Sequence, residues 1–167
     1  MKKKPAATDP RCAKCSVPAA QRVCITVKGR GPDFCPTLRL PQATRSARRL
    51  LRDPGTLEFA RQATIQEAQC YAGRDRKPFV SRPVKPRLQE IVEFAGKMGY
   101  RRLGVVFCDG LRREAVAVTR VLEQQGFDVV SVVCKVGGVP KEQIGITQQQ
   151  KIRIGESFSV QSQVNLG

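Results

Sequence analysis

The chain has 167 residues, enough for one domain and a small appendage, and a formal charge of +16 at pH 7. It contains seven cysteines but no histidine, so it lacks the commonest general base and the commonest nitrogen ligand for a metal. No apolar run approaches the roughly 18–20 residues that span a membrane, and the basic start is not followed by the apolar segment of a secretory signal. We therefore expect no membrane association and a cytoplasmic location, where reduced cysteines serve metal or redox chemistry.

The positive charge is concentrated in the first half of the chain. Residues 1–87 hold 20 Lys and Arg against 6 Asp and Glu, whereas residues 88–167 hold 10 against 8. A basic segment attracts nucleic acid because binding releases counterions, which makes nucleic acid one candidate partner. The scatter of the basic residues and the few aromatic side chains favour a solvated surface instead.

The segment 12–41 combines four cysteines with several prolines and glycines, a composition that excludes a regular helix or a long strand. The cysteines follow the spacing Cys-x2-Cys-x8-Cys-x10-Cys, at Cys12, Cys15, Cys24 and Cys35. Four thiolates make a complete tetrahedral set for zinc or a full set for an iron–sulfur cluster. Because the segment has no core of its own, a metal would supply its folding free energy. We expect zinc or an iron–sulfur cluster here, and the alternative is four unliganded cysteines.

The middle of the chain predicts two helices. The first is expected over residues 56–71 with Thr56 as its N-cap, and Cys70 near its end is expected to be structural. Residues 74–86 contain three prolines among basic neighbours and predict a loop. The second helix is expected over residues 86–98, where apolar side chains recur at helical spacing.

Residues 101–140 predict a βαβ unit. The run 103–108 is continuously apolar, as in a strand buried on both faces. Residues 110–125 change to the helical period, and residues 128–136 are again apolar and β-branched. Such a unit implies parallel strands and a right-handed crossover. Since two strands alone are marginal, either Arg22–Lys28 adds a strand or the sheet is incomplete.

The expected fold class is therefore α/β, with a partial parallel, Rossmann-like sheet, flanking helices and an irregular N-terminal Cys-rich metal-binding segment. Three segments are expected along the chain. They are a Cys-rich segment at 1–41, an α/β domain at 42–155 and a tail without clear pattern at 156–167.

Cys108 and Cys134 each follow a predicted strand, at the edge where open α/β sheets form their sites. The simpler interpretation is that both are small buried hydrophobes. Alternatively they form a second thiol site with Asp109, because a helix N-terminus after Cys108 and the cation of Lys135 after Cys134 both stabilise thiolates. Asp109 is a metal ligand in this interpretation, although a helix N-cap is the commoner role for such a residue.

Three stretches resemble a known family: the CAKC…C…CP pattern, EIVEFAGKMGYRRLGVVFCDGLRREA, and SVVCKVGGVPKEQIGI. The family consists of uncharacterised bacterial and archaeal metal-binding proteins with an N-terminal four-Cys motif and a CKVGG stretch, and the resemblance covers residues 12–154. It implies an α/β fold with cysteines at strand ends and metal binding through Cys12, Cys15, Cys24 and Cys35. It implies no established reaction.

Family members continue with further strand–helix units, whereas SFSVQSQVNLG does not resemble that continuation. We therefore expect a truncated or frame-shifted C-terminus, which translation of the downstream DNA in the other two frames would test.

Two functions remain open. The first is a metal-binding protein, and the sequence leaves open whether it is an enzyme. Any acid–base chemistry would have to be performed by cysteine, Asp109, Lys135 or a metal-bound water. The second is a zinc-stapled basic nucleic-acid-binding module that contacts phosphates through Arg45, Arg48, Arg49 and Arg52. No pattern indicates an oligomeric state.

Overall fold

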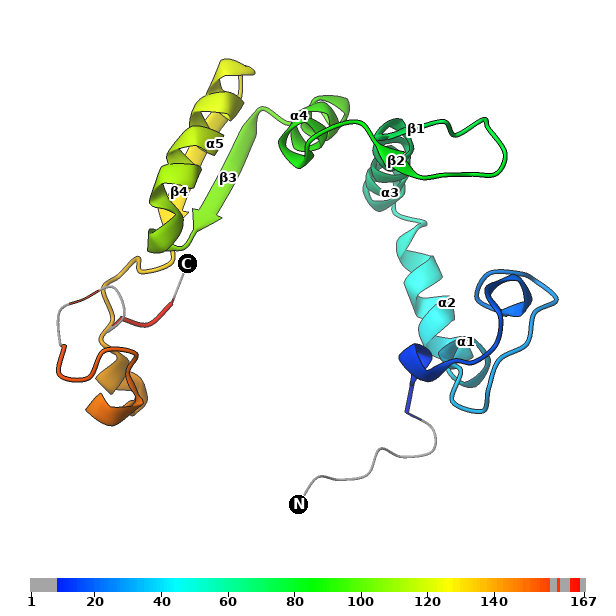
Figure 1. Cartoon of the computed structure of the whole chain (residues 1–167), viewed down its shortest axis with the longest axis horizontal. Coiled ribbons are helices and arrows are strands. Elements are labelled where there is room, and N and C mark those ends of the chain that lie inside the picture. Colours follow the sequence, from blue (N-terminus) through cyan, green and yellow to red (C-terminus); the bar gives the residue numbers. More distant parts are fainter. Residues whose placement is uncertain (1–8, 157–158, 160–162, 166–167) are drawn as a thin grey trace. The chain divides into compact units, whose positions relative to one another are not determined.

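The computed structural model describes residues 9–156, 159 and 163–165, a mixture of helices and strands with a small parallel sheet (Figure 1). The chain divides into two units, Met1–Arg61 and Gln62–Gly167. The basic start at residues 1–8 and part of the predicted tail at 156–167 lie outside the described residues. Among the described residues, none of the helices has the length and apolar character needed to cross a bilayer.

The first unit consists of short helices and turns, coloured blue to cyan in Figure 1. Two single-turn 3-10 helices precede three α-helices, the last of which runs into the second unit: η1 Cys12–Lys14, η2 Ala19–Gln21, α1 Pro36–Arg39, α2 Pro41–Leu50 and α3 Pro54–Gln69. Each α-helix begins at a proline, whose fixed φ suits the first helical turn and whose missing N–H would be unpaired there anyway. None of the described residues from 9 to 61 is buried, so this unit lacks a hydrophobic core.

The start of α3 differs from the prediction. Thr56 does not cap the helix, because its amide donates to the Oδ2 atom of Asp53 at 2.7 Å and the Asp53 carbonyl accepts from the amide of Leu57. Asp53 is thus the N-cap residue, and the helix begins two residues earlier than expected. The hydrogen bonds from the Thr56 amide and hydroxyl hold the pKa of Asp53 below its usual value.

The second unit contains a hairpin, a helix and a βαβ unit. Its elements are β1 Tyr71–Ala72, β2 Arg82–Pro83, α4 Arg87–Lys97, β3 Arg102–Phe107, η3 Asp109–Leu111, α5 Arg112–Gln124, β4 Asp128–Val133, η4 Lys141–Ile144 and η5 Gln148–Gln150. β1 and β2 pair antiparallel and enclose most of the loop predicted at 74–86. The hydrophobic core of this unit is small: Cys70, Ala95, Ala115, Leu122 and Cys134.

β3 and β4 form a two-stranded parallel sheet, which confirms the predicted parallel pairing. The register runs from Arg102 opposite Asp128 to Phe107 opposite Val133. Helix α5 connects the strands and packs on both of them, burying Ala115 and Leu122. The sheet therefore has one face covered by its own crossover helix.

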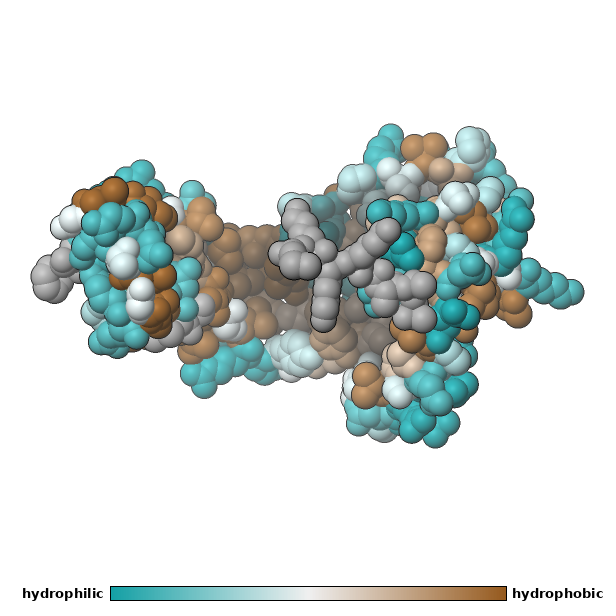
Figure 2. Space-filling model, turned by 90° about the horizontal axis from the view of Figure 1, so that it is seen from below, coloured by the Kyte–Doolittle hydropathy of each residue, from teal (hydrophilic) through white to brown (hydrophobic). Residues whose placement is uncertain are grey.

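The other face of this sheet is apolar and exposed. Alternate residues of the strands point away from α5, and their valines remain exposed, with Val106 at 66%, Val130 at 40% and Val132 at 39%. Apolar side chains also reach the surface elsewhere, as brown patches among the hydrophilic surface (Figure 2). The prediction that residues 103–108 are buried on both faces is wrong, because no second layer of the described chain covers this side.

The segment Arg22–Lys28 is not a strand, so the alternative in which it adds a third strand is wrong. It forms a series of turns that returns to a single bridge between Arg22 and Arg30. Gly29 allows this return, because a Cβ atom at that position would lie 2.4 Å from the backbone of Arg22 and Val23. The sheets of the described residues are therefore β1–β2 and β3–β4.

Candidate metal centre

Cys12 and Cys15 lie at the two ends of one tight turn. Cys12 starts η1 and Cys15 follows it, with the Cys15 amide donating to the Cys12 carbonyl at 3.0 Å. The turn begins one residue earlier, where the Lys14 amide donates to the Arg11 carbonyl at 2.8 Å. The Cys-x2-Cys spacing thus places two thiols on one backbone turn.

Cys24 sits in the loop that Gly29 closes. The Val23 amide donates to the Arg30 carbonyl at 3.0 Å, and the Arg30 amide donates to the Gln21 carbonyl at 2.8 Å. Inside the loop, the amides of Ile25 and Thr26 both donate to the Arg22 carbonyl. The position of Cys24 is therefore set by backbone hydrogen bonds on both sides of it.

Cys35 precedes α1 and is placed by a turn of its own. Its amide donates to the Pro32 carbonyl at 2.8 Å, and its carbonyl accepts from Arg39 at 2.9 Å. Gly31 lies against it, since a Cβ atom on Gly31 would stand 2.8 Å from both the Cβ and the Sγ atom of Cys35. The Cys35 side chain fits here because residue 31 is a glycine and has no side chain.

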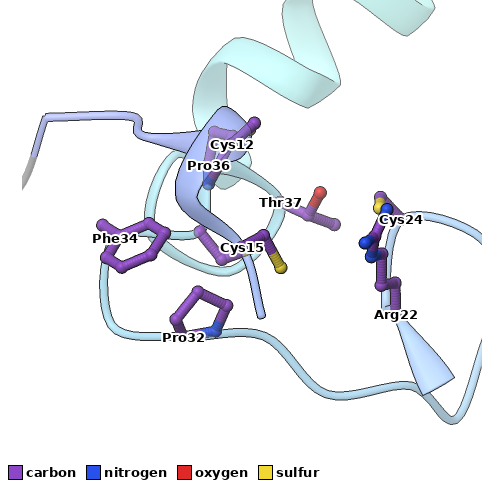
Figure 3. Close-up of a pocket in the computed structure, with 9 residues that line it drawn as sticks. Cys12, Cys15, Arg22, Cys24, Pro32, Phe34, Pro36 and Thr37 are labelled. Atoms are coloured by element: carbon purple, nitrogen blue, oxygen red, sulfur yellow. The ribbon is translucent and has the colours of Figure 1, made fainter. Parts of the chain in front are cut away.

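All four cysteines line the same pocket, which has a volume of about 90 Å3. In Figure 3, Cys12 and Cys15 lie on the η1 turn, Cys24 lies on the loop across the pocket, and the Cys15 side chain points into it. The rest of the wall is Arg22, Pro32, Phe34, Pro36 and Thr37. The Arg11 guanidinium lies 5.2 Å from the centre of the Phe34 ring and helps to hold this wall.

The four thiols are gathered but not closed into a coordination shell. Within the described residues, no three cysteine, aspartate or glutamate side chains stand close enough together to hold a metal ion. All four cysteines are free of disulfides, with Cys12 and Cys24 exposed and the other two half-buried. The donor chemistry fits zinc or an iron–sulfur cluster, which both accept thiolates.

The sequence prediction of this site omitted the residues that shape it. Gly29 and Gly31 act by close approach and Phe34 by covering one side, none of which is visible in the cysteine spacing. The sequence did contain a signal for this packing, because Gly29 lies near Cys24 and Gly31 lies near Cys35. Glycines often occupy positions where the backbone approaches other atoms closely.

The proposed second thiol site has a different geometry. Cys108 and Cys134 follow paired residues of β3 and β4, and the Cys134 amide donates to the Phe107 carbonyl at 2.8 Å. They lie at the same sheet edge, but Cys134 is buried and Cys108 is exposed. The pocket of about 400 Å3 at this edge is lined by Asp109, Arg112, Val133, Lys135, Gly138, Ser159 and Gln163 and by neither thiol.

The charged groups at this edge are already paired. The carboxylate of Asp109 accepts from the Arg112 guanidinium at 2.9 Å and caps neither η3 nor α5, so the N-cap prediction is wrong. The ammonium of Lys135 donates to the Gln163 carbonyl at 2.9 Å and to the side chain of Asn165. Neither group is directed at a thiol by these bonds.

A polar network between α3 and α4 was not predicted. Glu93 accepts from Lys85 at 2.7 Å, from buried Gln66 at 2.8 Å and from Gln89 at 2.9 Å. These hydrogen bonds, that of Lys85 foremost, lower the pKa of Glu93 to about 2. Lys97 extends the network to Gln66 and Gln69. The network ties the two helices together, and the buried thiol of Cys70 joins it by donating to the Gln66 carbonyl at 3.0 Å.

Comparison with known proteins places the chain in a family. Residues 35–161 match the family described as "Protein of unknown function (DUF1847)". The chain belongs to this family. The match begins at the fourth cysteine of the motif, so Cys12, Cys15 and Cys24 precede it.

One curated relative is the "Uncharacterized protein MJ0455" of Methanocaldococcus jannaschii, which is 42% identical over 72 residues. Those residues are 43% of this chain and 35% of the relative, so the chain spans about a third of the length of the curated relative it matches. No solved structure matches the chain.

Proposed function

We propose that the first unit binds one zinc ion through Cys12, Cys15, Cys24 and Cys35. One observation supports the proposal above all: a unit without a single buried residue among residues 9–61 has four free cysteines around one pocket. Something other than apolar burial must hold such a unit in one conformation. A thiolate-bound metal is the means that its side chains provide.

The energetic need is large. Chains of about sixty residues are marginal even when they have a core, and small domains without one use disulfides or metals. Zinc bound by four thiolates contributes roughly 10–16 kcal/mol of apparent binding free energy in small zinc domains. We propose a reducing compartment such as the cytoplasm, because thiolate ligands must stay unoxidised.

A closed set of four thiolates leaves no open coordination position for a substrate. The proposed role of the zinc is therefore structural, and we assign no reaction to it. An iron–sulfur cluster is the alternative ligand of the same thiols. We favour zinc because four thiolates form a complete tetrahedral set for a single zinc ion.

Anaerobic purification of the full chain, followed by metal analysis and a visible absorption spectrum, tests the proposal. We expect a colourless protein with one zinc per chain, loss of the zinc in Cys24→Ser, and retention of it in the control Cys108→Ser. A brown protein that contains iron and labile sulfide would show that the four thiols bind an iron–sulfur cluster and not zinc. A native chain without either metal would overturn the proposal.

A second proposal concerns the sheet. We infer that β3–α5–β4 is part of a larger Rossmann-like arrangement, in which a second layer covers the exposed valine face. If such a layer covers the face in solution, a fluorescent dye that binds apolar surface should bind the native chain and the variant with Val106, Val130 and Val132 all changed to Ser equally. Weaker dye binding by the variant would show that the face is open and would contradict the proposal.

A further inference from the structure

We infer that α2 is a binding face for the phosphate backbone of double-stranded nucleic acid. Its arginines Arg45, Arg48, Arg49 and Arg52 follow the spacing i, i+3, i+4, i+7, which places them on one side of a helix. The helical turn continues past Leu50, since the amides of Leu51 and Arg52 donate to the carbonyls of Arg48 and Arg49. Arg52 therefore stays in line with the other three.

These four side chains form a hollow of their own. All four are exposed, and together they line an open pocket of about 390 Å3 to which no other residue contributes. Guanidinium groups carry several donors in a planar fork that matches phosphate oxygens. A hollow lined by such groups alone fits an anion with many oxygens.

No carboxylate of the described chain neutralises this cluster. Residues 34–52 contain no Asp or Glu, and none of the four arginines forms an ion pair among the described residues. The nearest acid in sequence, Asp53, already accepts from the Thr56 amide. By contrast, Arg61, Arg87, Arg102, Arg112 and Arg153 are each paired with a carboxylate.

Local helix energetics do not explain the cluster. Arginines in the last turn interact favourably with the helix dipole, which accounts for Arg48 and Arg49 but not for Arg45 in the middle of α2. Like charges three and four residues apart destabilise a helix. A polyanion that spans the four groups would remove this repulsion.

The geometry favours a nucleic-acid duplex among polyanions. Arg45 and Arg52 are seven residues apart, about 10 Å along a helix axis, and duplex DNA presents one phosphate charge per roughly 1.7 Å of its axis. Residues 36–52 contain no aromatic side chain for base stacking, the main extra contribution to single-strand binding. We therefore expect binding that does not depend on base sequence.

A membrane surface fits the helix less well. Interfacial helices bury a broad apolar face with bulky side chains. The side of α2 away from the arginines has only alanines in its middle and leucines at its two ends, namely Ala43, Ala47, Leu40, Leu50 and Leu51, so it presents no continuous bulky apolar face. The inference does not depend on the metal, and it can hold or fail whether or not the cysteines bind zinc.

Fluorescence anisotropy with the full chain and a labelled 20-base-pair DNA duplex tests the inference. With four phosphates neutralised, affinity should fall about 150-fold when salt rises from 50 to 200 mM, a logarithmic slope of about −3.6. The variant R45Q/R48Q/R49Q/R52Q should lose most binding at 50 mM salt and nearly all of this slope. Glutamine is a good helix former, so circular dichroism should show an unchanged helix content.

The matched control is R74Q/R76Q/R113Q/R120Q, which removes the same charge from exposed arginines of the second unit. It should bind the duplex within about threefold of the native chain, because distant charges are screened. Equal losses in the two variants would overturn the inference in favour of general charge attraction. Absence of duplex binding at 50 mM salt would also overturn it, as would binding to phosphatidylserine vesicles without duplex binding.

Discussion

The two units of this chain keep their shape in different ways. The second unit buries Ala95, Ala115 and Leu122 and joins two parallel strands through a crossover helix. The first unit buries none of its described residues, and its loops are held by backbone hydrogen bonds around four thiols. The second unit therefore depends on apolar packing, whereas the first depends on local turns and, in our proposal, on a metal.

The comparison explains where glycine matters. In the first unit, Gly29 and Gly31 lie where a Cβ atom would meet backbone or a cysteine at 2.4 and 2.8 Å. In the second unit, Gly96, Gly104 and Gly110 have open space around the same position. Close approach of the backbone takes the place of side-chain packing in the unit that lacks a core.

Metal removal is expected to produce the largest difference between the two units. A zinc chelator should make trypsin cleave after Arg22, Lys28 and Arg30 roughly a hundredfold faster, because the binding free energy of the metal is the folding free energy of this unit. Cleavage after Arg120 in α5 should keep its rate. The measurement is mass spectrometry of timed digests. Similar acceleration at all four sites would contradict independent stabilisation of the units.

A core substitution should affect the second unit alone. Leu122 is 3% exposed, and Leu122→Ala is expected to lower the free energy of unfolding by about 2–5 kcal/mol. Urea denaturation of the second unit measures this change, and zinc content should stay at one per chain. Val116→Ala, at a position that is 45% exposed, is the control and should cost about 1 kcal/mol or less. Loss of zinc in Leu122→Ala would show that the units are coupled.

The reverse experiment uses Gly29→Ala. The added Cβ atom would overlap the backbone of Arg22 and Val23 and displace the loop that bears Cys24. We expect a cost of about 1–3 kcal/mol, measured as a roughly 10- to 100-fold weaker zinc affinity in competition with a coloured chelator. Gly110→Ala, where nothing stands in the way, should bind zinc normally. Normal zinc affinity in Gly29→Ala would show that the conformation of this loop does not affect the metal site.

The smallest expected effect concerns the pH dependence of the second unit. The pKa of Glu93 is lowered from 4.5 to about 2, so its ionised form stabilises the fold at pH values above about 4.5. This contribution is lost as pH falls from about 4.5 to 2. Urea midpoints at several pH values should therefore fall less steeply over this range in Glu93→Gln than in the native chain. Exposed Glu123→Gln should keep the native slope, and a native slope in Glu93→Gln would contradict the role of the network.

Regular periodicity made the βαβ unit predictable. The strand expected at 103–108 and the helix expected at 110–125 correspond to β3 Arg102–Phe107 and α5 Arg112–Gln124. The parallel pairing followed from the crossover helix, as the structure confirms. The exposure of Val106 was not predictable, because a continuous apolar run does not reveal whether a second layer is present.

Other features depend on contacts that no local pattern reports. Helix α2 was missed because arginine replaces the apolar stripe by which helices are recognised, although arginine and alanine form helices well. The alternative in which Arg22–Lys28 adds a strand is wrong because Gly29 turns the chain back on itself. The network around Glu93 joins residues 27 positions apart, beyond the reach of any periodicity.

The candidate site was predictable in its residues but not in its geometry. The spacing of Cys12, Cys15, Cys24 and Cys35 indicated that they act together, and they line one pocket. Metal binding itself stays a prediction. Cys108 and Cys134 lie at one sheet edge as expected but not in one pocket, because the chain leaves the two strands differently, into η3 after Cys108 and into turns at Cys134.

Hydrogen exchange of the full chain, with and without zinc, tests the central claim most directly. Amides that close the loops of the first unit, such as Cys15, Arg30 and Cys35, should be protected in the zinc-loaded chain and exchange freely in Cys24→Ser. The amides of β4 and α5 should be equally protected in both. Protection of the first unit that survives the loss of zinc and of Cys24 would contradict the account.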